Sequence, residues 1–263
     1  MTSDERQRDG SQDPGGHQAA PPCFALLREN TLPSPERLGA AMVELGFELG
    51  EEPIEVKEDS LLLPLAHGAA LRLTLTPAQQ SKLADLPPGL TSPPEEEIAK
   101  CKAQLLTVLQ GIEGSPLTQD LLMCRATAAV LRVSPAIGAM FGRSRSIHDA
   151  KLWEGIDADM NEEDPPIELM VDLSIADEGQ GRLSILTHGM PRYGRENFHI
   201  FAPQTKGQDA AELCFHLVYE LLSQPDLEYP SGTRLGRRAR EKHRLDRGPS
   251  PINPKETVMI LRM

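Results

Sequence analysis

Two histidines, His188 and His199, flank a short segment that contains Arg192, Arg195 and Glu196. Both histidines fall in strand-like runs, so two neighbouring strands would bring imidazole, guanidinium and carboxylate groups together. Such a set could carry out acid–base chemistry or bind an anion. His188, Glu196 and His199 are therefore the candidate catalytic residues, and Arg192 and Arg195 are candidate binding residues.

The same residues also fit a structured turn, in which histidine and arginine side chains cap backbone carbonyls and pair with Glu196. We favour this structural interpretation, because the sequence has no G-x-S-x-G, H-E-x-x-H or G-x-x-x-x-G-K-[ST] pattern. These patterns commonly supply a nucleophile, a metal site or a phosphate-binding loop. We expect a protein that is not an enzyme, with a hydrolase or transferase site around His188, Glu196 and His199 as the alternative.

A calcium-loop pattern is present at Asp157, Asp159 and Asn161, with Glu168 at the twelfth position. The sixth position of such a loop requires glycine for its turn, and here it is Glu162. We interpret the segment as a solvated acidic loop.

A second possible metal set places His216 between Glu212 and Glu220 at helical spacing. Zinc could use these groups, but on a solvated helix face they are more often charge compensation. We expect no metal and no cofactor.

The segment 234–247 is strongly basic, with seven Lys or Arg against two acids. Its central arginines, Arg237, Arg238 and Arg240, are candidate binding residues. The segment could bind phosphate or nucleic acid, but it has no interleaved aromatic side chains for base stacking. It fits equally well against the protein's own acidic surface or an acidic partner.

Composition limits the class of protein. The 263 residues carry a net charge of −12, so unselective nucleic-acid binding by the whole chain is not expected. Residues 1–20 are polar and have no apolar core of a signal peptide, so we expect a disordered tail. The four cysteines form no CxxC pair, and no apolar run reaches the roughly 20 residues of a membrane span. We expect a soluble, cytoplasmic protein.

Hydrophobic patterns predict an α+β protein with two sheet-bearing halves, 21–75 and 100–263, joined by a proline-rich linker at 76–99. Each half has a strand–helix–strand order, so we expect ferredoxin-like units with a mostly antiparallel C-terminal sheet. The predicted strands are 23–28, 54–56, 61–65, 70–75, 104–109 and 136–141, and the predicted helices are 35–45, 116–133, 146–153 and 208–223.

The last third has the clearest pattern. Alternating apolar residues from Ile167 to Ile175 predict a strand, a second strand ends at His188, and a final strand follows the basic segment. Several short motifs occur in order: Pro166-Ile-Glu-Leu-Met-Val171, Leu186-Thr-His-Gly-Met190, Tyr193-Gly-Arg-Glu196, Tyr219-Glu-Leu-Leu222, Ser231-Gly-Thr233, Gly248-Pro-Ser250 and Thr257-Val-Met-Ile-Leu261.

This order of motifs over 166–263 resembles the bacterial family known as domain of unknown function 4261. His188 and the arginine-rich stretch depart from the family pattern. The resemblance implies a fold and a bacterial origin, and it implies no catalytic residue. The leading interpretation is a non-catalytic bacterial interaction protein, of an immunity or adaptor type, that binds another protein.

Overall fold

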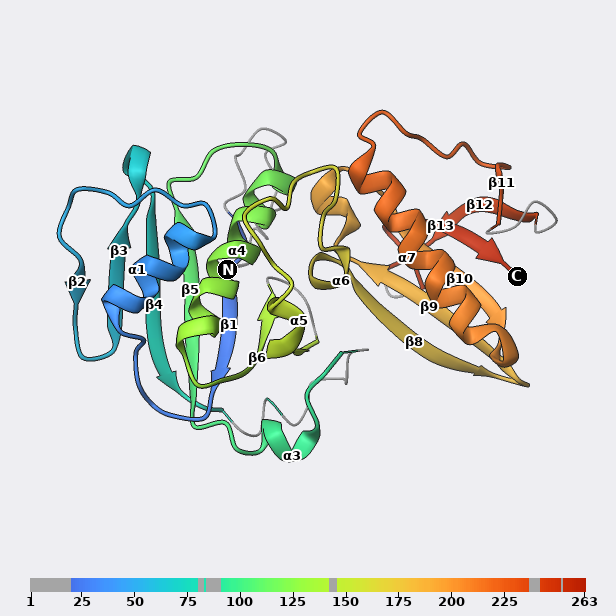
Figure 1. Ribbon diagram of the computed structural model, residues 1–263. Helices are drawn as coiled ribbons and strands as arrows, with labels where there is room; N and C mark the ends of the chain where they lie inside the picture. Colours follow the sequence, from blue (N-terminus) through green and yellow to red (C-terminus); the bar gives the residue numbers. More distant parts are fainter. Residues whose placement is uncertain (1–19, 80–82, 84–90, 142–145, 237–241, 252) are drawn as a thin grey trace, which may run out of the picture.

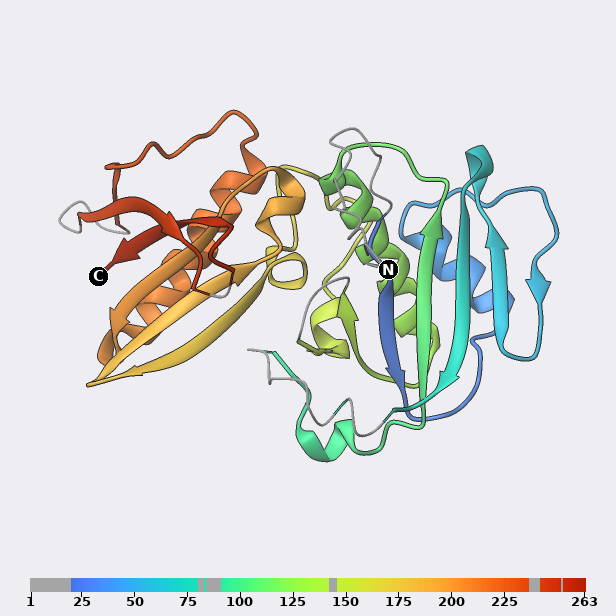
Figure 2. The same cartoon turned by 180° about the vertical axis from the view of Figure 1, so that it is seen from behind.

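A computed structural model describes residues 20–79, 83, 91–141, 146–236, 242–251 and 253–263. The predicted tail at 1–20 lies outside these residues except for Ala20. The predicted α+β class is confirmed, with two sheets and three main helices. α1 and α4 cover one face of the larger sheet, and α7 covers one face of the smaller sheet (Figure 1). The view from behind shows the opposite faces, with the strands in front of these helices (Figure 2).

The larger sheet has seven strands in the order β2-β3-β4-β5-β1-β6-β7, and all its pairs are antiparallel. Its strands and helices are β1 (Cys23–Leu27), α1 (Pro35–Glu44), β2 (Glu55–Val56), β3 (Ser60–Pro64), β4 (Ala70–Pro77), α3 (Glu95–Ile98), β5 (Ala103–Gln110), α4 (Pro116–Val133), β6 (Ala136–Phe141), β7 (His148–Asp149) and α5 (Ala150–Trp153).

Local sequence signals position the two main helices of this sheet. Ser34 and Ser115 each precede a proline at the first helical position, and each hydroxyl accepts a hydrogen bond from a backbone amide of the first turn. Gly46 follows α1 with φ of +84°, a conformation that glycine adopts without strain. The predicted helices at 35–45 and 116–133 are therefore confirmed.

The predicted linker does not separate the two sheets. β5 follows the linker in sequence, yet it lies between β4 and β1 and pairs with both. Leu83 from the linker is buried against Leu26 and Ile137 in a small second core. Strands from both predicted halves thus form one sheet, because antiparallel pairing joins segments that are distant in sequence.

The smaller sheet has six strands in the order β11-β12-β13-β10-β9-β8. Its elements are α6 (Ile167–Met170), β8 (Asp172–Gly179), β9 (Arg182–His188), the short 3-10 helix η2 (Met190–Tyr193), β10 (Asn197–Pro203), α7 (Gly207–Ser223), β11 (Arg234–Leu235), β12 (His243–Pro249) and β13 (Thr257–Arg262). β10 and β13 are parallel, and the other four pairs are antiparallel.

The expected strand from Ile167 to Ile175 is wrong in its first part. Residues 167–170 form the short helix α6, and the strand begins only at Asp172. Ile167 and Leu169 are both buried, although they belong to one helical turn. Alternating apolar residues on a short turn that is buried on several sides resemble a strand in sequence. The predicted helix at 146–153 is likewise divided into β7 and α5.

Candidate functional site

The strongest candidate site lies where the two sheets meet. A cavity of about 270 Å³ is bordered there by His188, Arg192, Asp172, Asn197 and other residues of both sheets. His188 ends β9, and Arg192 is in the 3-10 turn η2 that follows it. His188 and Arg192, singled out from the sequence as candidate catalytic and binding residues, thus border the same cavity.

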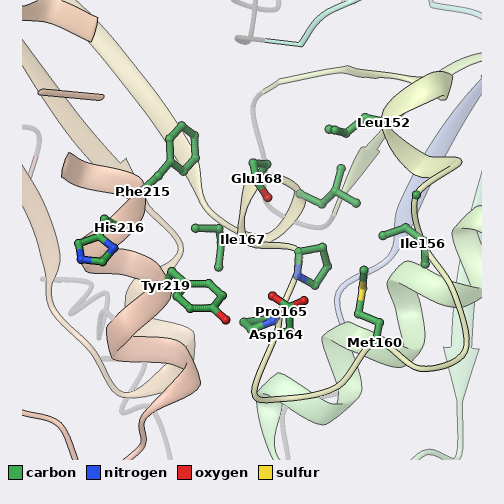
Figure 3. A pocket seen from close by; sticks show the side chains of 13 residues that line it. Leu152, Ile156, Met160, Asp164, Pro165, Ile167, Glu168, Phe215, His216 and Tyr219 are labelled. Carbon is green, nitrogen blue, oxygen red and sulfur yellow. The ribbon is translucent and has the colours of Figure 1, made fainter. Parts of the chain in front are cut away.

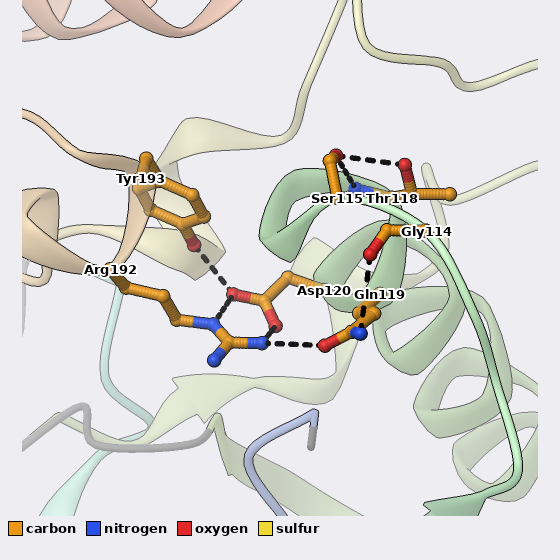
Figure 4. Close-up of polar contacts among 7 residues, drawn as sticks. All are labelled: Gly114, Ser115, Thr118, Gln119, Asp120, Arg192 and Tyr193. Carbon is orange, nitrogen blue, oxygen red and sulfur yellow. Dashed lines mark hydrogen bonds and ion pairs between the residues drawn. The ribbon is translucent and has the colours of Figure 1, made fainter. Parts of the chain in front are cut away.

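Arg192 reaches from this turn to Asp120 on α4, 72 residues earlier in the chain. Its Nε and Nη2 atoms each donate to a different oxygen of Asp120, both at 2.7 Å. Tyr193 donates its hydroxyl proton to Asp120 Oδ2 at 2.7 Å, and Gln119 Oε1 accepts from Arg192 Nη2 at 3.3 Å. Figure 4 shows this bidentate pair between α4 and η2.

The pair is shielded from water. The Asp120 side chain is 0% exposed and the Arg192 side chain 13%. Burial raises the pKa of the Asp120 carboxyl, while the hydrogen bonds from Arg192 and Tyr193 act in the opposite direction. Burial and the Asp120 charge raise the pKa of Tyr193 well above its usual value, so its hydroxyl stays a donor. The pair links η2 to α4, and the Asp120 carboxylate and the Arg192 guanidinium are occupied by each other.

His188 is engaged by a neighbouring strand. Its Nε2 lies 2.8 Å from Ser174 Oγ on β8. In the β9–β10 register His199 lies opposite Leu186, so His188 and His199 point to the same face of the sheet. Phe198 and Ile200, which alternate with His199 on β10, are buried in the core with the apolar residues of α7. His188 and His199 therefore lie on the face of the sheet opposite α7.

His199 does not border the cavity with His188. It is 6% exposed, and the centroid of its ring lies 4.0 Å from the centroid of the Phe201 ring. Burial lowers the pKa of His199 below its ordinary value. A histidine covered in this way is poorly placed to exchange protons with a substrate.

Glu196 is also directed elsewhere. It pairs with Arg247 on β12, with 2.7 Å between Glu196 Oε2 and Arg247 Nε. Only His188 of the three candidate catalytic residues lines the cavity, so the set does not converge.

Arg195 has the capping role that the structural interpretation expects. Its Nη2 donates to the carbonyl oxygens of Gln224 and Pro225, at 3.2 and 2.6 Å, just beyond the end of α7. A cation at this helix end also interacts favourably with the helix dipole.

The basic segment is only partly described. Arg237, Arg238 and Arg240 lie outside the described residues. Arg244 pairs with Asp246 at 2.9 Å, and Arg247 pairs with Glu196. The described arginines of 234–247 thus include two that contact the protein's own acids, as one of the open interpretations expects.

A second cavity, of about 500 Å³, lies between α7 and the segment 152–169. Phe215, His216 and Tyr219 border it from α7, and Met160 and Ile167 lie across from them (Figure 3). His216 Nε2 lies 3.4 Å from Glu220 Oε1. Glu212, the third member of the predicted set, accepts a hydrogen bond from Gln208. The described residues contain no group of three side chains suited to hold a metal ion.

The acidic loop that resembles a calcium site is organised by its own backbone. Asp157 Oδ1 accepts from the amides of Asp159 and Met160, each at 3.0 Å. Asn161 Oδ1 accepts from the amide of Glu163 at 2.8 Å. Such local turns account for aspartate and asparagine at these positions.

All four cysteines are free and buried. Burial raises the pKa of Cys23 and of Cys214 to about 12, so each remains a protonated thiol at neutral pH. None of the four has the exposed, acidified thiol of a nucleophile. None of the described helices has the length and apolarity to span a membrane.

Asp120 and Gln119 are the residues at this site that sequence reasoning missed. Asp120 occurs within the apolar stripe of α4, three residues after Leu117 and four before Cys124. An acid at such a position is a sign of a buried partner, because an unpaired buried charge is costly. The sequence offers no sign that the partner is Arg192.

Comparison of the chain with family models, curated proteins and solved structures finds no match. The resemblance of residues 166–263 to domain of unknown function 4261 therefore stays a prediction.

Proposed function

We propose that this protein is a non-catalytic interaction protein, of an immunity or adaptor type, that acts by binding another protein. The observation that carries the proposal is the separate engagement of the candidate catalytic groups. His188 contacts Ser174, Glu196 pairs with Arg247, and His199 is covered beside Phe201. Groups held in this way stabilise a framework.

Bacterial origin and a cytoplasmic location belong to the same proposal, supported by the motif order over 166–263 and by four free thiols. We also propose a ferredoxin-like arrangement for the centre of the larger sheet. The strand order β4-β5-β1-β6, with α1 after β1 and α4 after β5, supports it.

An enzyme is the second candidate function, and the cavity where the sheets meet favours it. His188 and Asp172 lie opposite each other in the β8–β9 register, and both border that cavity with Arg192. A hydrolase or transferase would use His188 as its acid or base. Phosphate or nucleic-acid binding through 234–247 is the weaker alternative.

The two leading candidates differ in their response to His188→Ala and Glu196→Ala. An interaction protein should keep its stoichiometric partner in affinity enrichment from host cells, while its melting temperature falls because a framework contact is lost. Wild-type turnover of a small substrate that His188→Ala abolishes, with the melting temperature unchanged, would contradict the proposal and support the enzyme.

A further inference from the structure

Exposed large apolar side chains gather at one edge of the larger sheet. In the part of the chain that the structure describes, five such residues are exposed. Four of them lie within 43–56: Val43 at 53%, Leu49 at 41%, Ile54 at 38% and Val56 at 56%. We call these four residues the β2 edge patch, since β2 is the terminal strand there. The fifth is Ile175, on β8 of the other sheet.

Strand pairing shows on which side of the sheet this patch lies. Leu49 is bridged to Leu65, and Val56 pairs with Leu61. Both partners are buried in the main core, which α1 covers. Because directly paired residues point to the same face, Leu49 and Val56 lie on the α1 side of the sheet.

Val43 extends the patch onto α1. A Cβ atom at Gly39 would lie 3.4 Å from Leu49 Cδ1, so the Gly39 position of the helix faces Leu49. Val43 is four residues further along α1 and therefore on the same helix face. In Figure 1 α1 lies in front of the sheet, and β2 runs along its outer edge.

The chain around the patch is strongly acidic. Residues 44–59 contain seven acids against one lysine, Lys57. The acids are Glu44, Glu48, Glu51, Glu52, Glu55, Glu58 and Asp59, and all are exposed. Among the described residues, none of the seven forms an ion pair.

We propose that the β2 edge patch is a docking surface for a basic polypeptide segment that carries apolar side chains. The apolar residues would bury surface against the partner, and the surrounding acids would select a positively charged segment and speed its encounter. A nucleic acid is disfavoured because its phosphates would meet these carboxylates. This inference rests on the proposed interaction function and names the partner chemistry for it.

A defined peptide tests the surface directly. The full-length protein would be titrated with a synthetic peptide of alternating leucine and lysine, and its amide NMR shifts followed. Peptides of alternating serine and lysine, and of leucine and glutamate, separate charge from apolar contact. We expect the leucine–lysine peptide to bind most tightly, with shifts concentrated in 43–59. Shifts spread over other surfaces, or equal binding of the serine–lysine peptide, would overturn the proposal.

Two pairs of variants separate the contributions. Val56→Ser should weaken leucine–lysine peptide binding about tenfold, while Ile175→Ser, at a comparably exposed site, should not change it. Glu55→Gln with Glu58→Gln should weaken binding and reduce its salt dependence. Glu95→Gln with Glu96→Gln, at exposed acids of α3, is the matched control. Equal effects of patch and control variants would contradict the assignment.

Photo-crosslinking in host cells distinguishes failure of the surface from failure of the function. p-Benzoylphenylalanine would replace Val56 in one sample and Ile175 in another, and the adducts would be identified by mass spectrometry. We expect an adduct from position 56 to a basic, apolar segment of another protein. An adduct only from position 175 keeps the interaction function but overturns the surface. An adduct to a second copy of this chain also overturns it, and no adduct together with substrate turnover overturns both.

Discussion

Arg192 holds Asp120 through two parallel hydrogen bonds of 2.7 Å, and this pair links helix α4 of the larger sheet to the turn after β9 of the smaller sheet. Bidentate geometry gives the contact directional specificity as well as energy. The 3-10 turn η2 and α4 also contact each other directly. The pair therefore contributes a specific polar contact between the two sheets, beside the continuous apolar core that also joins them.

Removing one member of this pair should be strongly destabilising. Asp120→Asn keeps the side-chain size but leaves the Arg192 charge without its counter-ion, so we expect a loss of about 3–5 kcal/mol in the free energy of unfolding. Chemical denaturation measures it. Glu97→Gln, which breaks the solvent-accessible pairs with Arg28 and Lys100, is the control and should have a much smaller effect. Equal losses in the two variants would show that the buried pair has no special role.

Replacing the other member of the pair, Arg192, should cause a loss of stability that depends on pH. Arg192→Met leaves the buried Asp120 carboxyl without the guanidinium that opposes its raised pKa. The carboxyl should then bind a proton more readily in the folded than in the unfolded state, so lowering the pH favours the folded form. The stability difference between wild type and Arg192→Met should shrink in acid. Denaturation curves at several pH values test this, and a constant difference would contradict it.

Stability of the wild type should fall as the pH drops below the ordinary histidine pKa of 6.5. Burial lowers the pKa of His148, so between this value and the lower folded-state pKa the unfolded chain binds the proton preferentially. His148→Gln cannot titrate and should reduce the pH dependence, although His199, whose pKa burial also lowers, retains part of it. An unchanged pH profile would exclude His148 as a cause.

Gly138 should not tolerate a side chain. A Cβ atom there would clash with the backbone carbonyl oxygen of His148, on the paired strand β7. We expect Gly138→Ala to cost about 2 kcal/mol through overpacking, measured by denaturation. At Gly155 the nearest atom, the Leu152 carbonyl oxygen, would be 3.8 Å from a Cβ, so Gly155→Ala is the control. Similar stability of the two variants would mean that the strands separate easily.

Replacing each of the two capping serines by alanine should lower the stability of the protein by different amounts. Ser115 Oγ accepts from the Thr118 amide at 3.0 Å and also donates to Glu162 at 2.7 Å. Ser34 Oγ likewise donates to a glutamate, Glu36, at 2.5 Å, but it accepts from the Arg37 amide at the longer distance of 3.4 Å, so its cap bond is the weaker one. Ser115→Ala should therefore cost about 1 kcal/mol, and Ser34→Ala less. Thermal unfolding of both variants compares them, and a larger effect at Ser34 would contradict this ranking.

Local signals explain why much of the fold could be predicted. The serine–proline pair at 115–116 determined where α4 begins, and the apolar run at 136–141 determined β6. Both depend on residues that are close in sequence. The same local reasoning failed at 167–170, where a buried helical turn has the apolar alternation of a strand.

The candidate site was less predictable. His188 and Arg192, both singled out from the sequence, share a cavity, but Glu196 and His199 do not border it. The partner of Arg192 is Asp120, which lies in a different sheet unit of the chain. Contacts between distant residues such as these depend on strand register and side-chain direction. Neither can be derived from the spacing of residues in the sequence alone.

The sequence by itself determined the α+β class, the main helices and most strands, because capping, glycine turns and apolar periodicity act over a few residues. Only the tertiary structure decided that β5 enters the larger sheet between β4 and β1, and that Asp120 and Arg192 meet. These relationships depend on pairing and burial between segments far apart in the chain. The acidic segment around β2 illustrates this difference. Its charge can be read from the sequence, but only the tertiary structure shows that β2 is the terminal strand of the larger sheet.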